Sequence, residues 1–387
     1  MSALISGVGE TDYSKKSGRT TTHLGMQAAL AAARDAGIDV RDIDGVVSFP
    51  HSLSSEDVAA NLGLHALRHS VTVAMGGASS VAALRHARLA IESGAARHVL
   101  ILRARNGCSG GRIHERPSQL PAQHFRTQLE HPYGWNTAAQ RYAMICRRYM
   151  HDHGLTREQL GAVALAARAH AQLNPRAMMY GRELTMEQYL AGRMIADPYH
   201  LFDCCLETDG ACAVIVSAQA MPSGPPSVRI VAVAEGRPRT PDDLTNRPDL
   251  LAIGLAPAAA EVWERTGLAP ADMDAAMIYD CFTFEVIHQL EAAGFAPEGG
   301  GGKFAASGAI RLDGSLPVNT HGGLLSEGHL SGLNHVVEAV RQLRGGLGGT
   351  GLGIRQVEGA RHVAVTGWGD LGDGSFAVLA NERGTAR

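Results

Sequence analysis

Two short glycine-rich motifs in the sequence have spacings that are typical of binding or catalytic sites. Gly346–Gly351 fits G-x-G-x-x-G, the loop that holds a dinucleotide pyrophosphate between a strand and a helix. Gly107–Gly111 fits G-x-S-x-G, which in a strand-turn-helix context exposes a nucleophilic serine, here Ser109. The first motif is expected between a helix and a strand, which is the reverse order, and a poor helix sequence follows Gly111. We therefore interpret both segments as loops, with Ser109 as a residue that lines a binding site at most.

Cysteine and histidine, which bind metals and act as nucleophiles or bases, are numerous but form no familiar motif. The six cysteines include no C-x-x-C pair, and Cys204 and Cys205 are adjacent, which suits neither a zinc knuckle nor a disulfide between them. We expect reduced thiols that lie mostly in the core. The 18 histidines show no H-E-x-x-H or comparable ligand spacing, so the sequence predicts no metal site.

Charge and composition exclude several classes of function. The chain has 35 basic and 38 acidic residues, a net charge of −3, and no Lys/Arg block, which argues against nucleic-acid binding. No apolar run reaches the length of a membrane span, and the first residues do not form a signal peptide. We expect a globular protein of the cytoplasm with no membrane span.

The hydrophobic pattern of the first hundred residues predicts an α/β fold. Strands are expected at Ile5–Val8, Val46–Phe49, Val71–Ala74 and Val99–Leu102, and helices at Thr22–Ala36 and Ser79–Ser93. This β-α-β-β-α-β order is that of a layered α/β protein. From residue 106 to 201 the pattern is mostly helical, with helices expected at Trp135–His153 and Thr156–Gln172, and we interpret this stretch as an insertion.

A second α/β block follows the insertion and repeats parts of the first. Strands are first expected at Ala211–Val216 and Val228–Val233. The second block then has expected strands at Ala275–Ile278 and Val363–Val365 and helices at Ala258–Thr266, Thr283–Ala293 and Ser331–Leu343. Asp35–Val47 is similar to Arg265–Met277, and Gly94–Val99 to Gly359–Val363, in the same order. Two copies indicate a duplicated unit. The expected domains are the first part of the N-terminal half (1–105), the insertion (106–201), the completion of that half (202–225) and the C-terminal half (226–387).

Three segments carry a resemblance to a known superfamily. Asn319–His329 resembles the N-x-x-G-G-x-x-x-x-G-H block of thiolases. Tyr279–Phe282 (Y-D-C-F) resembles the H-D-C-F motif of the sterol-carrier-protein-X branch, and Cys204–Ala211 resembles its C-C-x-x-S-D-G-A segment. Arg148–Arg182 also looks like the insertion of the bacterial lipid-transfer-protein members. The resemblance spans nearly the whole chain.

This resemblance implies a fold, ligands and partners. The thiolase fold has two duplicated α/β halves in an αβαβα five-layer sandwich, with a loop region inserted in the first half and a homodimer as the usual unit. The implied substrate is an acyl-CoA thioester, so coenzyme A enters as part of the substrate and no other cofactor is expected. The implied partner is a small acyl-CoA-binding protein with an OB fold and a zinc ribbon, which would bring any zinc.

Both cysteines on which thiolases depend are absent from this sequence. The position of the nucleophilic cysteine falls on Gly77, and the C-terminal region with the second cysteine reads Val365–Asp370 and contains none. Ser79 or Ser80 is an alternative nucleophile, although we expect these serines to cap the following helix.

The two residues that remain in motif positions are Tyr279 and His329. Y-D-C-F resembles the lipid-transfer-protein-type aldolases, which cleave 3-hydroxyacyl-CoA thioesters of steroid side chains. Those enzymes usually carry a second tyrosine in S-E-A-Y, where this chain has Ser326-Glu-Gly-His329. His321 lies in the same block and is a candidate for a second polar contact with the substrate.

Retro-aldol cleavage needs no nucleophile, because it requires a base for the β-hydroxyl proton, a site for the thioester enolate that forms when the carbon–carbon bond breaks, and an acid that protonates the carbon. An imidazole with a pKa near ~6.5 suits a base, and a phenol near ~10 suits an acid or a hydrogen-bond donor. A helix that starts after His329 would keep the ring neutral. The sequence therefore predicts His329 as the base, Tyr279 as the acid or donor, and the N–H groups of the turn at Gly76–Ser80 as ligands of the thioester oxygen.

The sequence thus predicts an aldol lyase that cleaves a bulky, steroid-side-chain-like 3-hydroxyacyl-CoA and releases a short acyl-CoA. Two alternatives stay open from the residues alone. One is a cysteine-independent acyltransferase or Claisen-type enzyme, which the histidine in place of tyrosine makes reasonable. The other is a catalytically silent, acyl-binding scaffold subunit, which the loss of both cysteines fits equally well.

Overall fold

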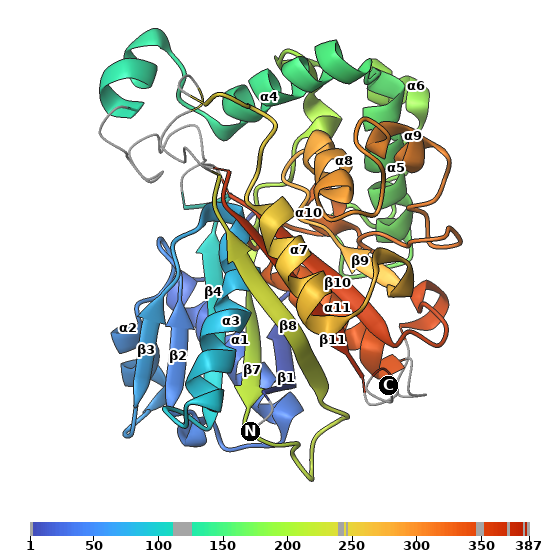
Figure 1. Ribbon diagram of the computed structural model, residues 1–387. Coiled ribbons are helices and arrows are strands. Elements are labelled where there is room, and N and C mark those ends of the chain that lie inside the picture. Colours follow the sequence, from blue (N-terminus) through green and yellow to red (C-terminus); the bar gives the residue numbers. More distant parts are fainter. Residues whose placement is uncertain are drawn as a thin grey trace.

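Nine strands of the part of the chain that the structure describes form one mixed sheet (Figure 1). The structure is a computed structural model, and it describes residues 3–110, 126–238, 244, 247–345, 352–369, 372–381 and 384. The strand order is β3-β2-β4-β7-β1-β8-β11-β10-β9. The strands are β1 (Leu4–Glu10), β2 (Gly45–Ser48), β3 (His69–Thr72), β4 (His98–Asn106), β7 (Asp209–Ser217), β8 (Val228–Gly236), β9 (Ala275–Met277), β10 (His362–Trp368) and β11 (Gly374–Ala380).

The sheet consists of two similar halves that meet at β1 and β8. In the first half β2 and β4 are parallel, and β4, β7 and β1 follow as antiparallel neighbours. In the second half β9 and β10 are parallel, and β10, β11 and β8 follow as antiparallel neighbours. Among the described residues, β1 and β8 pair at Leu4 with Arg229 and at Ile5 with Val228, and the N–H of Ile230 also donates to the carbonyl oxygen of Ala3. The predicted duplication is therefore visible in the topology.

The repeated sequence segments make the same local structure in both halves. Asp44 stands just before β2 and accepts the backbone N–H groups of residues 97 and 98 at the start of β4. Asp274 stands just before β9 and accepts those of residues 361 and 362 at the start of β10. Each aspartate thus ties together two neighbouring parallel strands, which explains why the Asp and Arg-His positions recur in the sequence.

Each half-sheet has helices on both faces. The inner helices lie between the two half-sheets, and the others cover the outer faces. The main helices are α1 (Thr21–Ala36), α2 (Ser55–Leu62), α3 (Ser79–Glu92), α7 (Leu255–Thr266), α8 (Thr283–Ala292) and α11 (Leu333–Gly345). Residues of a strand alternate between cores, because successive side chains point to opposite faces. Val46 packs in the core under α1 and α2, whereas Val47 packs in a second core with α3 and α11. Val363 of β10 lies in that same second core, and Ala364 lies in a third core under α7 and α8. The helices α3 and α11 share one core that lies between the two half-sheets, and the other two cores lie on the outer faces. This arrangement confirms the predicted αβαβα sandwich.

The inserted region packs on the second half, although it interrupts the first half in sequence. It contains α4 (Ala138–His153), α5 (Arg157–Gln172), α6 (Met186–Leu190) and the hairpin β5 (Met194–Ala196) and β6 (Tyr199–His200). These helices gather beside α8 and α9 (Gly301–Ala306) in the upper part of Figure 1. Tyr142 and Tyr149 contact Phe282 and Phe284, with ring centroids 5.4 and 5.2 Å apart.

Several local predictions are wrong in ways that have a physical cause. A helix, α2, connects β2 to β3 where the sequence predicted a direct connection; parallel strands need such a crossover. Its start was marked by a capping box between Ser54 and Asp57. The strand β3 begins two residues before the predicted Val71, and β11 at the C-terminal end was missed. Gly346–Gly351 lies outside the described residues.

The cysteines are all reduced, but most do not lie in the core as predicted. Only Cys146 and Cys212 are buried, and the other four are half-buried. Among the described helices, none has both the length and the apolar character that crossing a membrane requires.

Candidate active site

The structure brings Tyr279 and His329 together, as the sequence predicted. Tyr279 follows the end of β9 and begins the loop to α8, whereas His329 lies in the loop before α11. The phenolic oxygen of Tyr279 lies 3.4 Å from Nε2 of His329. Tyr279 is 5% exposed and His329 is 9% exposed, so only an edge of each ring reaches the surface. The two groups can exchange a proton with one another or with the same small ligand.

Arg105 determines which nitrogen of His329 carries the hydrogen. Its guanidinium donates to Nδ1 of the ring at 3.1 Å. A guanidinium has no acceptor, so Nδ1 must accept and the neutral ring holds its hydrogen on Nε2. Burial, together with the charges of Arg105 and Arg103, holds the pKa of His329 well below its usual value. His329 is therefore neutral, as expected, but because of burial and two cations rather than because of a helix start, and Nε2 is a donor toward Tyr279.

Sequence reasoning missed Arg103 and Arg105, which lie near the end of β4. They are two residues apart and therefore point to the same face of the strand. Arg103 donates to the carbonyl oxygen of Pro50 at 2.7 Å and stacks over Phe49. Burial, and the neighbouring charge of Arg105, lower the pKa of Arg103 to about 9. The sequence does contain a pattern from which they could have been predicted. Two arginines, two positions apart as on one face of a strand, directly follow the apolar run of residues 99–102.

Gly77 faces the ring of Tyr279, and no side chain fits there. A Cβ atom at this position would lie 2.3 Å from Cζ of Tyr279 and 2.3 Å from the carbonyl oxygen of Trp368. Carbon atoms in real proteins do not approach that closely unless the neighbour moves. The tyrosine ring thus occupies the space that the side chain of a nucleophilic residue at position 77 would need.

The two serines after Gly77 stabilise turns instead of capping α3, so the capping prediction is wrong. Ser79 Oγ accepts the backbone N–H of Met75 at 2.8 Å, and Ser80 Oγ donates to the carbonyl oxygen of Ser331 at 2.7 Å. The N-cap of α3 is Ala78, which makes no side-chain cap. The turn at Gly76–Ser80 was predicted to offer its N–H groups to the thioester oxygen. The N–H of Ala78 instead donates to the carbonyl oxygen of Met75 within the turn and is not available to a substrate.

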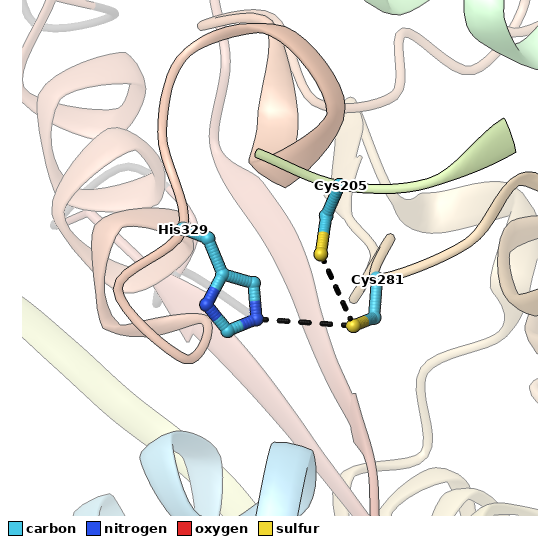
Figure 2. A group of neighbouring side chains, drawn as sticks. All are labelled: Cys205, Cys281 and His329. Atoms are coloured by element: carbon cyan, nitrogen blue, oxygen red, sulfur yellow. Dashed lines mark hydrogen bonds between the residues drawn. The ribbon is translucent and has the colours of Figure 1, made fainter. Parts of the chain in front are cut away.

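Two cysteines lie beside His329, as Figure 2 shows. The sulfur atoms of Cys205 and Cys281 are 3.3 Å apart, and Cys281 Sγ is 3.8 Å from Nε2 of His329. Two thiols and an imidazole within 4.8 Å of one another are a possible ligand set for a metal ion. A ligating histidine, however, needs a lone pair on that nitrogen and donates its other N–H to an acceptor. The guanidinium of Arg105 at Nδ1 imposes the opposite polarity, so the residues present do not fit a resident metal.

His321 belongs to a different buried hydrogen-bond network. In the described part of the chain, its ring bonds to His335 and not to Tyr279 or His329. Its Nε2 lies 2.9 Å from Nδ1 of His335, whose Nε2 lies 3.0 Å from Asp280. Asp280 also accepts the backbone N–H groups of Leu324 and Leu325 in α10 (Gly323–Ser326). This network connects the segment that carries Tyr279 to the segment that carries His329 and fixes their separation.

Ser109 is likewise engaged and lines no site in the described structure. Its hydroxyl donates to Asp209 at 2.5 Å, and Asp209 also accepts the backbone N–H groups of Cys108 and Ser109. These bonds close the loop after β4, next to Arg105.

Comparisons with known proteins show the family. A family model described as "Thiolase C-terminal domain-like" matches residues 236–381. A Mycobacterium tuberculosis protein named 17-hydroxy-3-oxo-4-pregnene-20-carboxyl-CoA lyase is 38% identical over 94% of this chain and 95% of its own length. The chain belongs to the thiolase superfamily. The resemblance that the sequence motifs predicted is confirmed.

Two further relatives place this thiolase-superfamily member near aldolases. A steroid side-chain-cleaving aldolase of Thermomonospora curvata is 37% identical over 89% of this chain and 90% of its own length. A solved structure of a Ltp2-ChsH2(DUF35) aldolase superposes with a TM-score of 0.90 at 36% identity and covers 99% of this chain and 98% of that one.

Proposed function

We propose that this protein is a CoA-thioester aldol lyase that cleaves a bulky 3-hydroxyacyl-CoA of the steroid side-chain type and releases a short acyl-CoA. The observation that carries the proposal is the contact between Tyr279 and His329, with the tyrosine ring in the space of a nucleophile at Gly77. The site retains groups that move protons and lacks one that forms an acyl-enzyme. The similarity to enzymes that are named lyase and aldolase supports the same conclusion.

The hydrogen-bond pattern supports roles opposite to those that the sequence suggested. In the reaction the β-hydroxyl loses a proton, the bond between the α- and β-carbons breaks, and the thioester enolate takes a proton on its α-carbon. Tyr279 acts as the phenolate: it takes the first proton, becomes the phenol and returns that proton to carbon. His329 is the donor: its Nε2–H stabilises negative charge on the phenolic or enolate oxygen, and Arg103 and Arg105 add to this field.

The assembly that we propose follows the sequence resemblance. The similar solved structure is a complex named Ltp2-ChsH2(DUF35), which supports a DUF35 protein with an OB fold and a zinc ribbon as partner. We propose in addition a homodimer, coenzyme A as part of the substrate, and the domain limits 1–105, 106–201, 202–225 and 226–387. A cytoplasmic location stays a prediction.

The acyltransferase alternative has less support, because it needs a group to carry the acyl chain. Gly77 offers none, and the hydroxyls of Ser79 and Ser80 are engaged in turns. A catalytically silent subunit would not need a neutral His329 whose Nε2 faces the phenol of Tyr279, so the silent-subunit alternative leaves this contact unexplained.

The experiment is to assay the purified chain, alone and with a DUF35 protein of the kind in that complex, on a 3-hydroxyacyl-CoA whose β-carbon is a ring carbon. We expect release of the ring ketone and of a short acyl-CoA in equal amounts. Thiolysis of a 3-oxoacyl-CoA without lyase activity would contradict the proposal, and the absence of both would favour the silent subunit.

A further inference from the structure

Cys205 and Cys281 lie opposite one another on two antiparallel segments, although they are 76 residues apart in sequence. The N–H of Cys205 donates to the carbonyl oxygen of Cys281 at 2.9 Å, and the neighbouring residues Cys204 and Phe282 form an antiparallel bridge. Directly opposed residues in such a pair have Cα atoms about 4.5–5.5 Å apart. A disulfide usually spans Cα atoms about 4.4–6.8 Å apart, so this backbone suits one.

The side chains are already aimed at one another, as Figure 2 shows. The two sulfur atoms need only close from 3.3 Å to about 2.05 Å, a movement that side-chain rotation supplies. Both cysteines are half-buried, so a small oxidant reaches them. The guanidinium groups of Arg103 and Arg105 beside His329 make the surroundings electropositive, which is where reactive thiols are found.

Other cysteines of the chain lack this arrangement. Burial raises the pKa of Cys146, Cys204 and Cys212 above the usual value, and the thiol of Cys204 donates to the carbonyl oxygen of His200. Cys204 is therefore a matched control: it is adjacent to Cys205 and half-buried like it, but is directed at a backbone oxygen.

We propose that Cys205 and Cys281 form a reversible disulfide that switches off the site, with a peroxide as the oxidant. One thiolate attacks the O–O bond and becomes a sulfenic acid, and the released hydroxide takes a proton to leave as water. The second thiolate attacks the sulfenic sulfur, the S–S bond forms and a second water leaves. Two thiols and one peroxide thus give one disulfide and two waters.

The bond would act on catalysis through Cys281, which is two residues from Tyr279. Its sulfur would move from the vicinity of His329 Nε2 toward Cys205, and the loop that carries Tyr279 would be tied to the segment after residue 203. The imidazole would lose the thiol that contacts its Nε2 at 3.8 Å, and with it one of the groups that hold the ring beside the phenol. This consequence for activity rests on the proposed lyase function, whereas the formation of the bond does not.

The crosslink is tested on the folded, full-length chain by counting thiols. Diamide serves as the probe, because it takes two hydrogens from a thiol pair and does not oxidise sulfur further. After oxidation and denaturation, alkylation should fall from six cysteines to four, and a peptide map should contain residues 205 and 281 in one linked fragment. Dithiothreitol should restore six. Cys204→Ser should still crosslink, and Cys205→Ser should not; six alkylated cysteines in oxidised wild type would overturn the proposal.

The effect on function is measured as lyase activity before and after diamide. Wild type and Cys204→Ser should lose at least tenfold and recover with dithiothreitol, whereas Cys205→Ser should keep its activity throughout. Equal loss in Cys205→Ser would show that the crosslink is not the cause and would overturn the switch. If the reduced protein has no lyase activity at all, the proposed function fails while the thiol count still decides the crosslink.

Discussion

The ring of Tyr279 and the missing side chain of Gly77 occupy the same space. A Cβ on residue 77 would lie 2.3 Å from the Cζ atom of the ring. A cysteine nucleophile and this tyrosine are therefore alternatives that one site cannot hold together. The absence of the nucleophile is a condition for placing the phenol beside His329.

Adding a methyl group at position 77 should displace the tyrosine. Gly77→Ala should lower the lyase rate and the melting temperature, since Cζ of Tyr279 and the backbone oxygen of Trp368 must move. In a Tyr279→Ala background the same change should cost less stability, because the clash with the ring is gone and only the one with the Trp368 oxygen remains. Denaturant unfolding of the four proteins of this double-mutant cycle gives the coupling. Additive effects would mean that the ring does not fill this space.

Removing the phenolic hydroxyl should abolish most of the activity and leave the fold intact. Tyr279→Phe keeps the ring packed against Gly77, so its melting temperature should match that of wild type. The rate should fall by about 10²–10⁴, the range for a proton-transfer group. His329→Ala should cause a similar loss, and the double variant should lose little more, because groups that act together are not additive. Wild-type turnover in Tyr279→Phe would remove Tyr279 from the site.

Replacing Arg105 should change the pH dependence. In wild type the pKa of His329 is well below 6.5, so the ring should stay neutral and lyase activity should not decline with a midpoint near pH 6.5. Arg105→Met removes a cation and the donor to Nδ1, so the pKa of His329 should rise and activity should fall at acidic pH.

Arg105→Lys retains the charge and should show the wild-type profile with a smaller rate. The ring signals of His329 in a nitrogen-detected NMR titration should report the hydrogen on Nε2 in wild type and a mixture of tautomers in Arg105→Met. An unchanged mixture in both proteins would contradict the positioning role of Arg105.

A buried acid should make the protein less stable as pH rises. Burial, and the nearby carboxylate of Glu10, raise the pKa of Glu327 to about 8 in the folded state. Its unfolded value is about 4.3, so its contribution to stability is complete below that pH and is lost as pH rises through 8. Glu327→Gln removes the ionisable group at nearly the same size and keeps one oxygen that can accept from the amides of Asn174 and Asn334, both of which donate to Glu327.

Urea unfolding at pH 5, 6.5 and 8 measures this effect. The free energy of unfolding of Glu327→Gln, relative to wild type, should increase with pH by at most about 1.4 kcal/mol per unit. A relative stability that is constant with pH would show that Glu327 is ionised in the folded protein.

Local patterns in the sequence were sufficient for the duplicated halves and for Tyr279 with His329. Tyr279 and His329 are themselves members of the motifs that resemble those of thiolases. The pattern of apolar residues along the chain predicts the strands and helices. The contacts of Arg105 with His329 and of Cys205 with Cys281 could not be predicted, because 224 and 76 residues separate the partners and only the folded sheet brings them together. The bonds of Asp280 to residues 324 and 325 could not be predicted for the same reason.

A cut in the chain between Ser217 and Val228 would leave two fragments, each with its own half of the sheet. Two residue pairs between β1 and β8 would contribute little to their reunion. The inserted helices would contribute more, since they belong to the first fragment and bury their aromatic residues on α8 of the second. Arg105 would be on one fragment and Tyr279 with His329 on the other, so lyase activity would measure the association of the two fragments. The protein is in this respect a natural starting point for a split-enzyme sensor.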